Sequence, residues 1–98
     1  MNNTTNITHD ILVNSGYRKI YFPYTKYVKE VEDNRHICHI AIYPSDDNNF
    51  SISINKYLSG FVGLMDSCNI NCIKDCQRAN KIIELFTNGL GLLVIPDE

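Results

Sequence analysis

The segment from residue 36 to about residue 57 constrains the fold of this chain more than any other. Its second half, FSISINKY, alternates: Phe50, Ile52 and Ile54 are apolar, and serine or asparagine stands after each. Successive side chains of a β-strand point to opposite faces, so this alternation predicts a strand with one buried face. The first half, RHICHIAIYP, is largely apolar on both faces, and the polar loop PSDDNN follows it. We therefore predict an antiparallel β-hairpin whose first strand is central and covered on both faces.

A second pattern, near the C-terminus, predicts an amphipathic helix over residues 72–87. Asn71 precedes this range as a suitable N-cap, and Asn88 with Gly89 supplies a suitable end. Within it, small or apolar residues recur at spacings of three and four, which places them on one side of a helix that packs against a sheet. These residues are Cys72, Cys76, Ala79, Ile83 and Phe86.

The N-terminal third predicts a short helix followed by strands at an edge of the sheet. Residues 1–7 are mostly polar and predict a frayed tail. Thr8 is a suitable N-cap for a helix that ends at Gly16, because a residue without Cβ adopts the left-handed conformation at low cost. Residues 17–32 have strand character. Pro23 cannot donate a hydrogen bond to a ladder, so a strand there lies at an edge or is interrupted.

Two further apolar runs complete the predicted fold. GFVGLM, residues 60–65, predicts a fourth strand, and LGLLVI, residues 90–95, predicts a final strand or a packed tail. The 98 residues suffice for one core, so we expect a single small domain over residues 1–98. We predict an α+β fold: a mostly antiparallel sheet of four to five strands, with a short N-terminal helix and one long C-terminal amphipathic helix packed on one face. A small open barrel plugged by the helix is the alternative.

Composition and charge limit the classes of protein to which this chain can belong. Nine basic and eleven acidic residues give a formal net charge of −2, so a general attraction to nucleic acid or anionic membrane is not expected. No apolar run approaches the ~20 residues of a membrane span. The first ten residues lack the basic and apolar regions of a signal peptide, which predicts a cytoplasmic protein with reduced cysteines. The many Asn, Ile and Lys residues are typical of small proteins encoded by phages and mobile elements.

The segment CNINCIKDC places Cys68, Cys72 and Cys76 four residues apart. On the predicted helix, Cys72 and Cys76 belong to the buried side, where a free cysteine behaves as a small apolar residue. The alternative is a thiolate site for zinc or an iron–sulfur cluster, with Cys38 or His36 as a fourth ligand. Because the spacing differs from that of common zinc and cluster motifs, we favour packing and expect no metal or other cofactor.

The sequence lacks the residue patterns of common enzymes. It contains no G-x-S-x-G elbow, no phosphate-binding G-x-x-x-x-G-K-[ST] loop and no H-E-x-x-H motif. His36 and His39 are three residues apart on a predicted strand and therefore point to opposite faces. Asp46 and Asp47 stand among turn-forming residues, which favours a solvated loop. We therefore expect a protein without enzymatic activity.

The stretch YRKIYFPYTKYVK, residues 17–29, mixes cations with aromatic residues, and its first following acid is Glu30. Tyr and Arg are enriched at the centres of protein interfaces, so the stretch predicts contact with a protein partner. The same mixture suits single-stranded nucleic acid, because bases stack on rings while cations meet phosphates. A third interpretation is an edge strand whose lysines prevent aggregation. The candidate binding residues are Arg18, Lys19, Tyr21, Tyr24, Lys26, Tyr27 and Lys29.

These observations favour a small non-enzymatic protein-binding module that acts on a larger protein partner. An accessory or inhibitor protein of a phage or mobile element, such as an anti-CRISPR, works in this way by occluding a surface of its target. The alternatives are binding of single-stranded nucleic acid through residues 17–29 and a thiolate metal protein. We also expect that the apolar residues 92–95 form an edge strand able to pair with a second copy in a homodimer.

Overall fold

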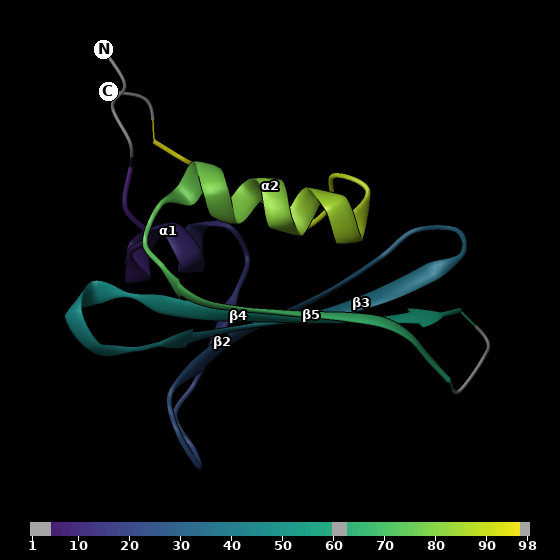
Figure 1. The fold of residues 1–98 in the computed structure, drawn as a ribbon, viewed down its shortest axis with the longest axis horizontal. Coiled ribbons are helices and arrows are strands. Elements are labelled where there is room, and N and C mark those ends of the chain that lie inside the picture. The colour runs from purple at the N-terminus through teal and green to yellow at the C-terminus, as the bar shows by residue number, and fades with distance from the viewer. Residues whose placement is uncertain (1–4, 60–62, 97–98) are drawn as a thin grey trace.

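The computed structural model of the chain describes residues 5–59 and 63–96 (Figure 1). In this described part, five strands form one antiparallel sheet in chain order, β1-β2-β3-β4-β5, and two α-helices lie on the same side of it. The α+β prediction is confirmed. The elements are α1 (His9–Asn14), β1 (Arg18–Ile20), β2 (Lys26–Glu32), β3 (His36–Pro44), a 3₁₀ turn (Asp46–Asn48), β4 (Phe50–Leu58), β5 (Leu64–Ile73) and α2 (Cys76–Thr87).

The predicted hairpin is confirmed as the centre of the sheet. β3 and β4 pair antiparallel along their whole length, with Ile40 opposite Ile54 and Ile42 opposite Ile52. These four side chains are buried and form one apolar surface, which we call the isoleucine layer. The helices and the C-terminal residues pack on this layer and complete the core.

The prediction that β3 is covered on both faces is wrong. On the face opposite the isoleucine layer, Ile37, Ala41 and Tyr43 stay half-buried and His39 is exposed. Both helices pack on the layer side, so within the described residues no element covers this second face. We call it the open face. A short chain with two helices has too little apolar helix surface to cover both sides of a five-stranded sheet.

Residues 90–95 form a packed tail and not a strand. Leu93 is buried, and Asn80 of α2 holds its backbone from both sides: Asn80 Nδ2 donates to the Leu93 carbonyl at 3.2 Å, and the Leu93 amide donates to Asn80 Oδ1 at 2.6 Å. The edge strand that we expected at residues 92–95 as the basis of a homodimer is therefore absent, because this backbone is engaged within its own chain.

The short helix α1 begins and ends as predicted. Thr8 Oγ1 accepts a hydrogen bond from the Ile11 amide at 3.2 Å, and Gly16 follows the helix with a φ of 92°. Strand β1 lies at an edge of the sheet and pairs with β2 alone, and Pro23 lies in the connection between these strands. The interruption expected at Pro23 is thus confirmed.

The prediction of a frayed N-terminal tail is wrong for residues 5–7. The Ile7 amide donates to the Lys74 carbonyl at 2.7 Å, and the Cys76 amide donates to the Thr5 carbonyl at 2.8 Å. Ile7 is also buried in the core. The N-terminal segment therefore gains both backbone partners and apolar contacts beside the start of α2. Residues 1–4 lie outside the described residues.

Helix α2 begins four residues later than predicted. Its N-cap is Asp75, whose carboxylate accepts a hydrogen bond from the Gln77 amide at 3.0 Å. Cys72 lies instead at a bulge in β5, with a φ of 59°, where Asn71 and Cys72 together stand opposite Ser51. The pairing of β5 with β4 decides the structure here, because it gives hydrogen-bond partners to the backbone from Leu64 to Ile73. Residues 60–62 of the predicted fourth strand lie outside the described residues.

The packed tail generates a test of this fold at two glycines with positive φ, Gly89 at 86° and Gly91 at 73°. A Cβ at Gly91 would lie 2.7 Å from Cδ1 of Ile40, whereas a Cβ at Gly89 would meet nothing within 4 Å. We expect Gly89→Ala to cost about 1–2 kcal/mol of unfolding free energy for the left-handed backbone alone. Gly91→Ala should cost about 1–3 kcal/mol more, because it also overpacks the isoleucine layer. Urea unfolding of both variants measures the difference, and equal costs would contradict the placement of the tail.

Candidate functional site

The three cysteines of the CNINCIKDC segment do not come together. Cys68 is half-buried in β5, Cys72 is exposed at the bulge, and Cys76 is buried in the first turn of α2. Burial, together with the nearby Asp75 carboxylate, raises the pKa of Cys76 to about 11. Within residues 5–59 and 63–96, no three His, Cys, Asp or Glu side chains are placed to hold one metal ion. Packing is thus confirmed for Cys76 and wrong for Cys72.

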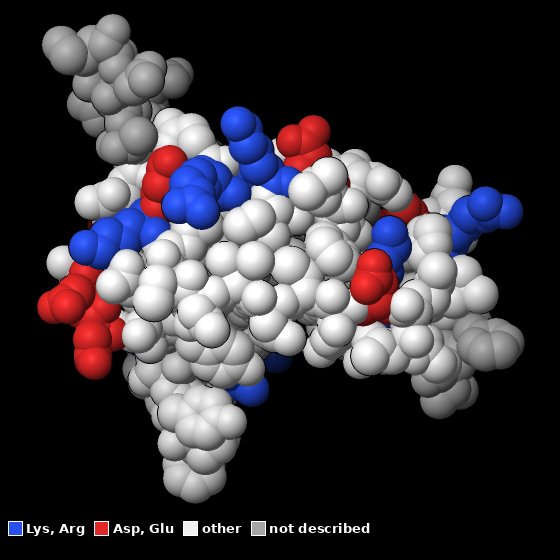
Figure 2. Space-filling view, viewed as in Figure 1, with Lys and Arg blue, Asp and Glu red and all other residues white. Residues whose placement is uncertain are grey.

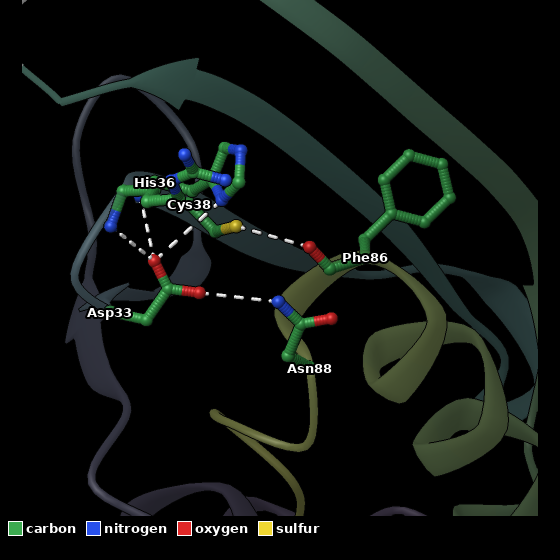
Figure 3. A network of polar contacts seen from close by, with 6 residues as sticks. Asp33, His36, Cys38, Phe86 and Asn88 are labelled. Atoms are coloured by element: carbon green, nitrogen blue, oxygen red, sulfur yellow. Dashed lines mark hydrogen bonds and ion pairs between the residues drawn. The ribbon is translucent and has the colours of Figure 1, made fainter.

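Asp33 joins the turn between β2 and β3 to the end of α2 (Figure 3). Its Oδ1 accepts hydrogen bonds from the amides of Arg35 at 2.8 Å and His36 at 2.7 Å, and its Oδ2 accepts from Asn88 Nδ2 at 3.2 Å. The two backbone donors, followed by Asn88, lower the pKa of Asp33 to about 2. The ionised carboxylate is therefore the form that this arrangement stabilises.

Asp33, His36 and Cys38 have the composition of a nucleophilic triad but not its geometry. Cys38 is buried, its thiol donates to the Phe86 carbonyl at 3.3 Å, and burial raises its pKa. A reactive cysteine needs an accessible sulfur with a lowered pKa. His36 Nδ1 lies 3.6 Å from Asp33 Oδ1, beyond good hydrogen-bond distance. We interpret this network as a structural tie between the β2–β3 turn and α2.

The open face of the sheet holds a shallow depression of about 690 Å³. Half-buried Val28 and Ala41, which pair across β2 and β3, lie at its centre. Charged and polar side chains from four strands surround them, so the depression is a mixed surface with an apolar floor. The surrounding residues are Arg18, Lys26, Glu30, His39, Tyr43, Ser53 and Asn55.

Two aromatic pairs accompany this depression. The rings of Tyr24 and Tyr43 have centroids 6.2 Å apart, and Lys26 Nζ lies 6.0 Å from the centroid of the Tyr43 ring. Further along β3, the His39 ring meets the Tyr57 ring edge to face, with centroids 5.3 Å apart. The open face therefore offers several aromatic rings beside cationic groups.

The connection between β1 and β2 projects from the sheet on the side away from the helices (Figure 1). Three of its residues are aromatic and exposed: Tyr21 to 70%, Phe22 to 85% and Tyr24 to 62%. We call residues 21–24 the aromatic tip. Figure 2 shows this projection as uncharged surface, with Lys or Arg atoms near its base. An aromatic cluster this exposed is unusual for a surface that meets only water.

The structure brings five of the seven candidate binding residues to one end of the molecule. Arg18 and Lys26 border the depression of the open face, and Tyr21 and Tyr24 belong to the aromatic tip. Lys19 Nζ lies 5.1 Å from the centroid of the Tyr21 ring. Arg18 and Lys26 thus lie on the open face, whereas Lys19, opposite Tyr27 on β2, lies on the other face of the hairpin beside the tip.

The other two candidates lie in the packing of the same hairpin. Tyr27 is buried, and its hydroxyl is 2.7 Å from His9 Nδ1. Lys29 donates to the Ser15 carbonyl at 2.7 Å, just beyond the end of α1. Because strand residues alternate between faces, a continuous stretch of sequence cannot place all its side chains on one surface.

Sequence reasoning missed four residues of the open face: His39, Tyr43, Asn55 and Tyr57. The alternation of β3 and β4 contained the signal, since each of these residues stands at a position opposite to the isoleucine layer. Because we expected β3 to be covered on both faces, we did not predict His39 and Tyr43 to be surface residues.

Comparisons of the chain with protein-family models, with curated proteins and with solved structures found no match. In the part of the chain that the structure describes, neither helix is long and apolar enough to cross a membrane.

The placement of the cysteines generates one prediction. In the native protein, Cys72 should react rapidly with a thiol reagent, because it is exposed, whereas Cys38 and Cys76 are buried. We expect the buried thiols to react at least about 100-fold more slowly, since they need local opening of the structure. Stopped-flow labelling of the native protein measures these rates. In a Cys68→Ser background, which removes the half-buried thiol, Cys72→Ser should remove the fast phase and Cys76→Ser should retain it. A fast phase that survives Cys72→Ser in this background would contradict the bulge.

The Asp33 network generates a second prediction, on pH. The folded-state pKa of Asp33 is lowered from 3.8 to about 2, so its contribution to stability is present above pH 3.8 and is lost as the pH falls toward 2. The difference in unfolding free energy between the native chain and Asp33→Asn should therefore shrink over this window. Urea unfolding at a series of pH values measures it. Asp46→Asn, in the exposed β3–β4 connection, is the matched control and should show no comparable change.

Proposed function

We propose that the protein is a non-enzymatic protein-binding module whose aromatic tip inserts into a pocket of a larger protein. The exposure of three aromatic rings on one projecting connection is the observation that carries this proposal. Aromatic residues at the centre of an interface supply most of its binding energy, because they bury a large area with few rotatable bonds. The tip has the composition and the shape of such an anchor.

The free energy gained by burying the aromatic tip is similar in size to the cost of forming a complex. Burial of one aromatic ring contributes about 1.5–3 kcal/mol, so three rings contribute about 5–9 kcal/mol. This is comparable with the cost of association, about 4–15 kcal/mol. The tip alone would offset that cost in part, and the neighbouring strand surface supplies the remainder of a stable interface.

The base of the tip is held firmly, which lowers the entropy lost on binding. On one side, Tyr27 is buried and Lys19 Nζ lies 5.7 Å from the centroid of its ring. Lys29 is engaged with the Ser15 carbonyl, and its Nζ lies 5.5 Å from the centroid of buried Tyr17. A projection on such a fixed base presents its rings in a limited set of orientations.

Occlusion of a partner surface requires only a rigid, complementary projection of this kind. The clusters that could support chemistry do not favour a reaction, since Cys38 and Cys76 are buried and the CNINCIKDC cysteines are dispersed. An inhibitor or accessory protein, of the type that the composition suggests, is therefore the form of the function that we favour.

A variant of the tip tests this proposal. Tyr21→Ser, Phe22→Ser and Tyr24→Ser combined should reduce capture of a specific protein from an extract of the native cell at least about tenfold, because the anchor is removed. The control variant combines Leu85→Ser and Val94→Ser, two exposed apolar residues elsewhere on the surface at 78% and 60% exposure. It should capture the same protein as the native chain.

Circular dichroism checks that the tip variant and its control remain folded. Mass spectrometry of the captured material identifies the partner in each case. Retention of the same protein by the tip variant, or capture of no specific protein by the native chain, would overturn the proposal.

A further inference from the structure

The open face carries aromatic rings, cationic side chains and short polar side chains close to one another. It carries the exposed rings of Tyr24 and His39, each paired with the half-buried ring of a central strand, Tyr43 and Tyr57 respectively. Arg18 and Lys26 border the same depression. Ser53 and Asn55 of β4 contribute short polar side chains between the two ring pairs.

The charged residues of this face follow one another along the strands. Lys26 lies at the end of β2 nearest the aromatic tip, and Glu30 lies four residues beyond it, beside His39 Nδ1 at 3.5 Å. Arg18 pairs with Val28, so it is the diagonal neighbour of both, about 7–8 Å from each. Four residues of strand separate Lys26 from Glu30 by about 13 Å. This exceeds the Debye length of about 8 Å at physiological salt, so Glu30 is largely screened from an anion held at Lys26.

We infer that the open face binds a short single-stranded nucleic acid, a second activity beyond the proposed contact of the tip with a protein. A base would stack on the ring of Tyr43, where Lys26 already lies close to the ring, and its phosphate would lie between Lys26 and Arg18. A second base would stack at the His39–Tyr57 pair. Asn55, Ser53 and Glu30 offer hydrogen bonds to base edges across the depression.

The arrangement favours nucleic acid over an acidic peptide for a chemical reason. An acidic peptide would use the cations but would leave the rings without flat partners, whereas every base has a face that stacks on an aromatic ring. The number of free cations determines how strongly binding should depend on salt. Lys29 lines the same depression, but its ammonium donates to the Ser15 carbonyl at 2.7 Å, so we count only Arg18 and Lys26.

The test is titration of the full chain with a fluorescein-labelled oligothymidylate of about 12 nucleotides, followed by anisotropy. With two phosphate contacts, log K should fall with log salt at a slope of about −1.4, and loss of either cation by Arg18→Ala or Lys26→Ala should reduce the slope by about 0.7. Tyr43→Ala should weaken binding at least about fivefold, and Tyr43→Phe should restore it, because stacking needs the ring and not the hydroxyl. The chain contains no Trp and six Tyr, so the quenching of tyrosine fluorescence that Tyr43→Phe removes is the part that arises from stacking on Tyr43.

Matched control variants distinguish binding at the open face from an effect of net charge or of the aromatic tip. Arg78→Ala with Lys81→Ala, on the exposed side of α2, changes the net charge as much as Arg18→Ala with Lys26→Ala and should leave the slope unchanged. The variant Tyr21→Ser with Phe22→Ser should bind the oligonucleotide like the native chain, so failure of the tip proposal and failure of this one are distinguishable. Thermal melts check that each variant is folded.

Three outcomes would overturn the inference. The first is no saturation by the native chain up to about 1 mM protein at about 50 mM salt. The second is a salt slope or affinity that the open-face variants leave unchanged. The third is displacement of the oligonucleotide by a peptide of about 11 glutamates, which matches the roughly 11 phosphate charges of the oligonucleotide, as effectively as by unlabelled oligothymidylate. That result would make the face a site for acidic peptides.

Discussion

Burial of the isoleucine layer is the interaction on which the rest of the structure depends. Ile40, Ile42, Ile52 and Ile54 form one apolar surface at the centre of the sheet. Each buried side chain contributes about 1.5–3 kcal/mol, so the four contribute about 6–12 kcal/mol, as much as the net stability of a typical small domain. Helices, tail and N-terminal segment all pack on this side, because only there do they gain such burial. The open face is the consequence of that asymmetry.

The one-sided packing also separates the parts of the chain that stabilise the fold from those available for recognition. On the covered side, Asn80 holds the tail, Asp33 ties the β2–β3 turn to Asn88, and Cys38 donates to the end of α2. On the other side lie the depression and the aromatic tip. The β1–β2 hairpin connects the two, since Tyr27 points into the core while its neighbour Lys26 borders the open face.

A local sequence pattern predicts only part of the candidate site. Composition alone marked residues 17–29 as a binding segment, and five of the seven residues named there do lie on or beside the tip and the open face. Tyr27 does not, because alternation along β2 turns it inward. Tyr43 and Asn55 could not be joined to the segment from the sequence, since they reach it only through the pairing of β2 with β3 and of β3 with β4.

The sequence by itself determined the central hairpin, the caps of α1 and the amphipathic side of α2, because each depends on contacts between residues close in the chain. Tertiary structure decided the rest. The local sequence around Cys72 is compatible with either a helix or a strand. The pairing of β5 with β4 selects the strand. Only the packing of both helices on the isoleucine layer determined which face of the sheet stays open, because burial on one side is a property of the assembled chain and not of any one segment.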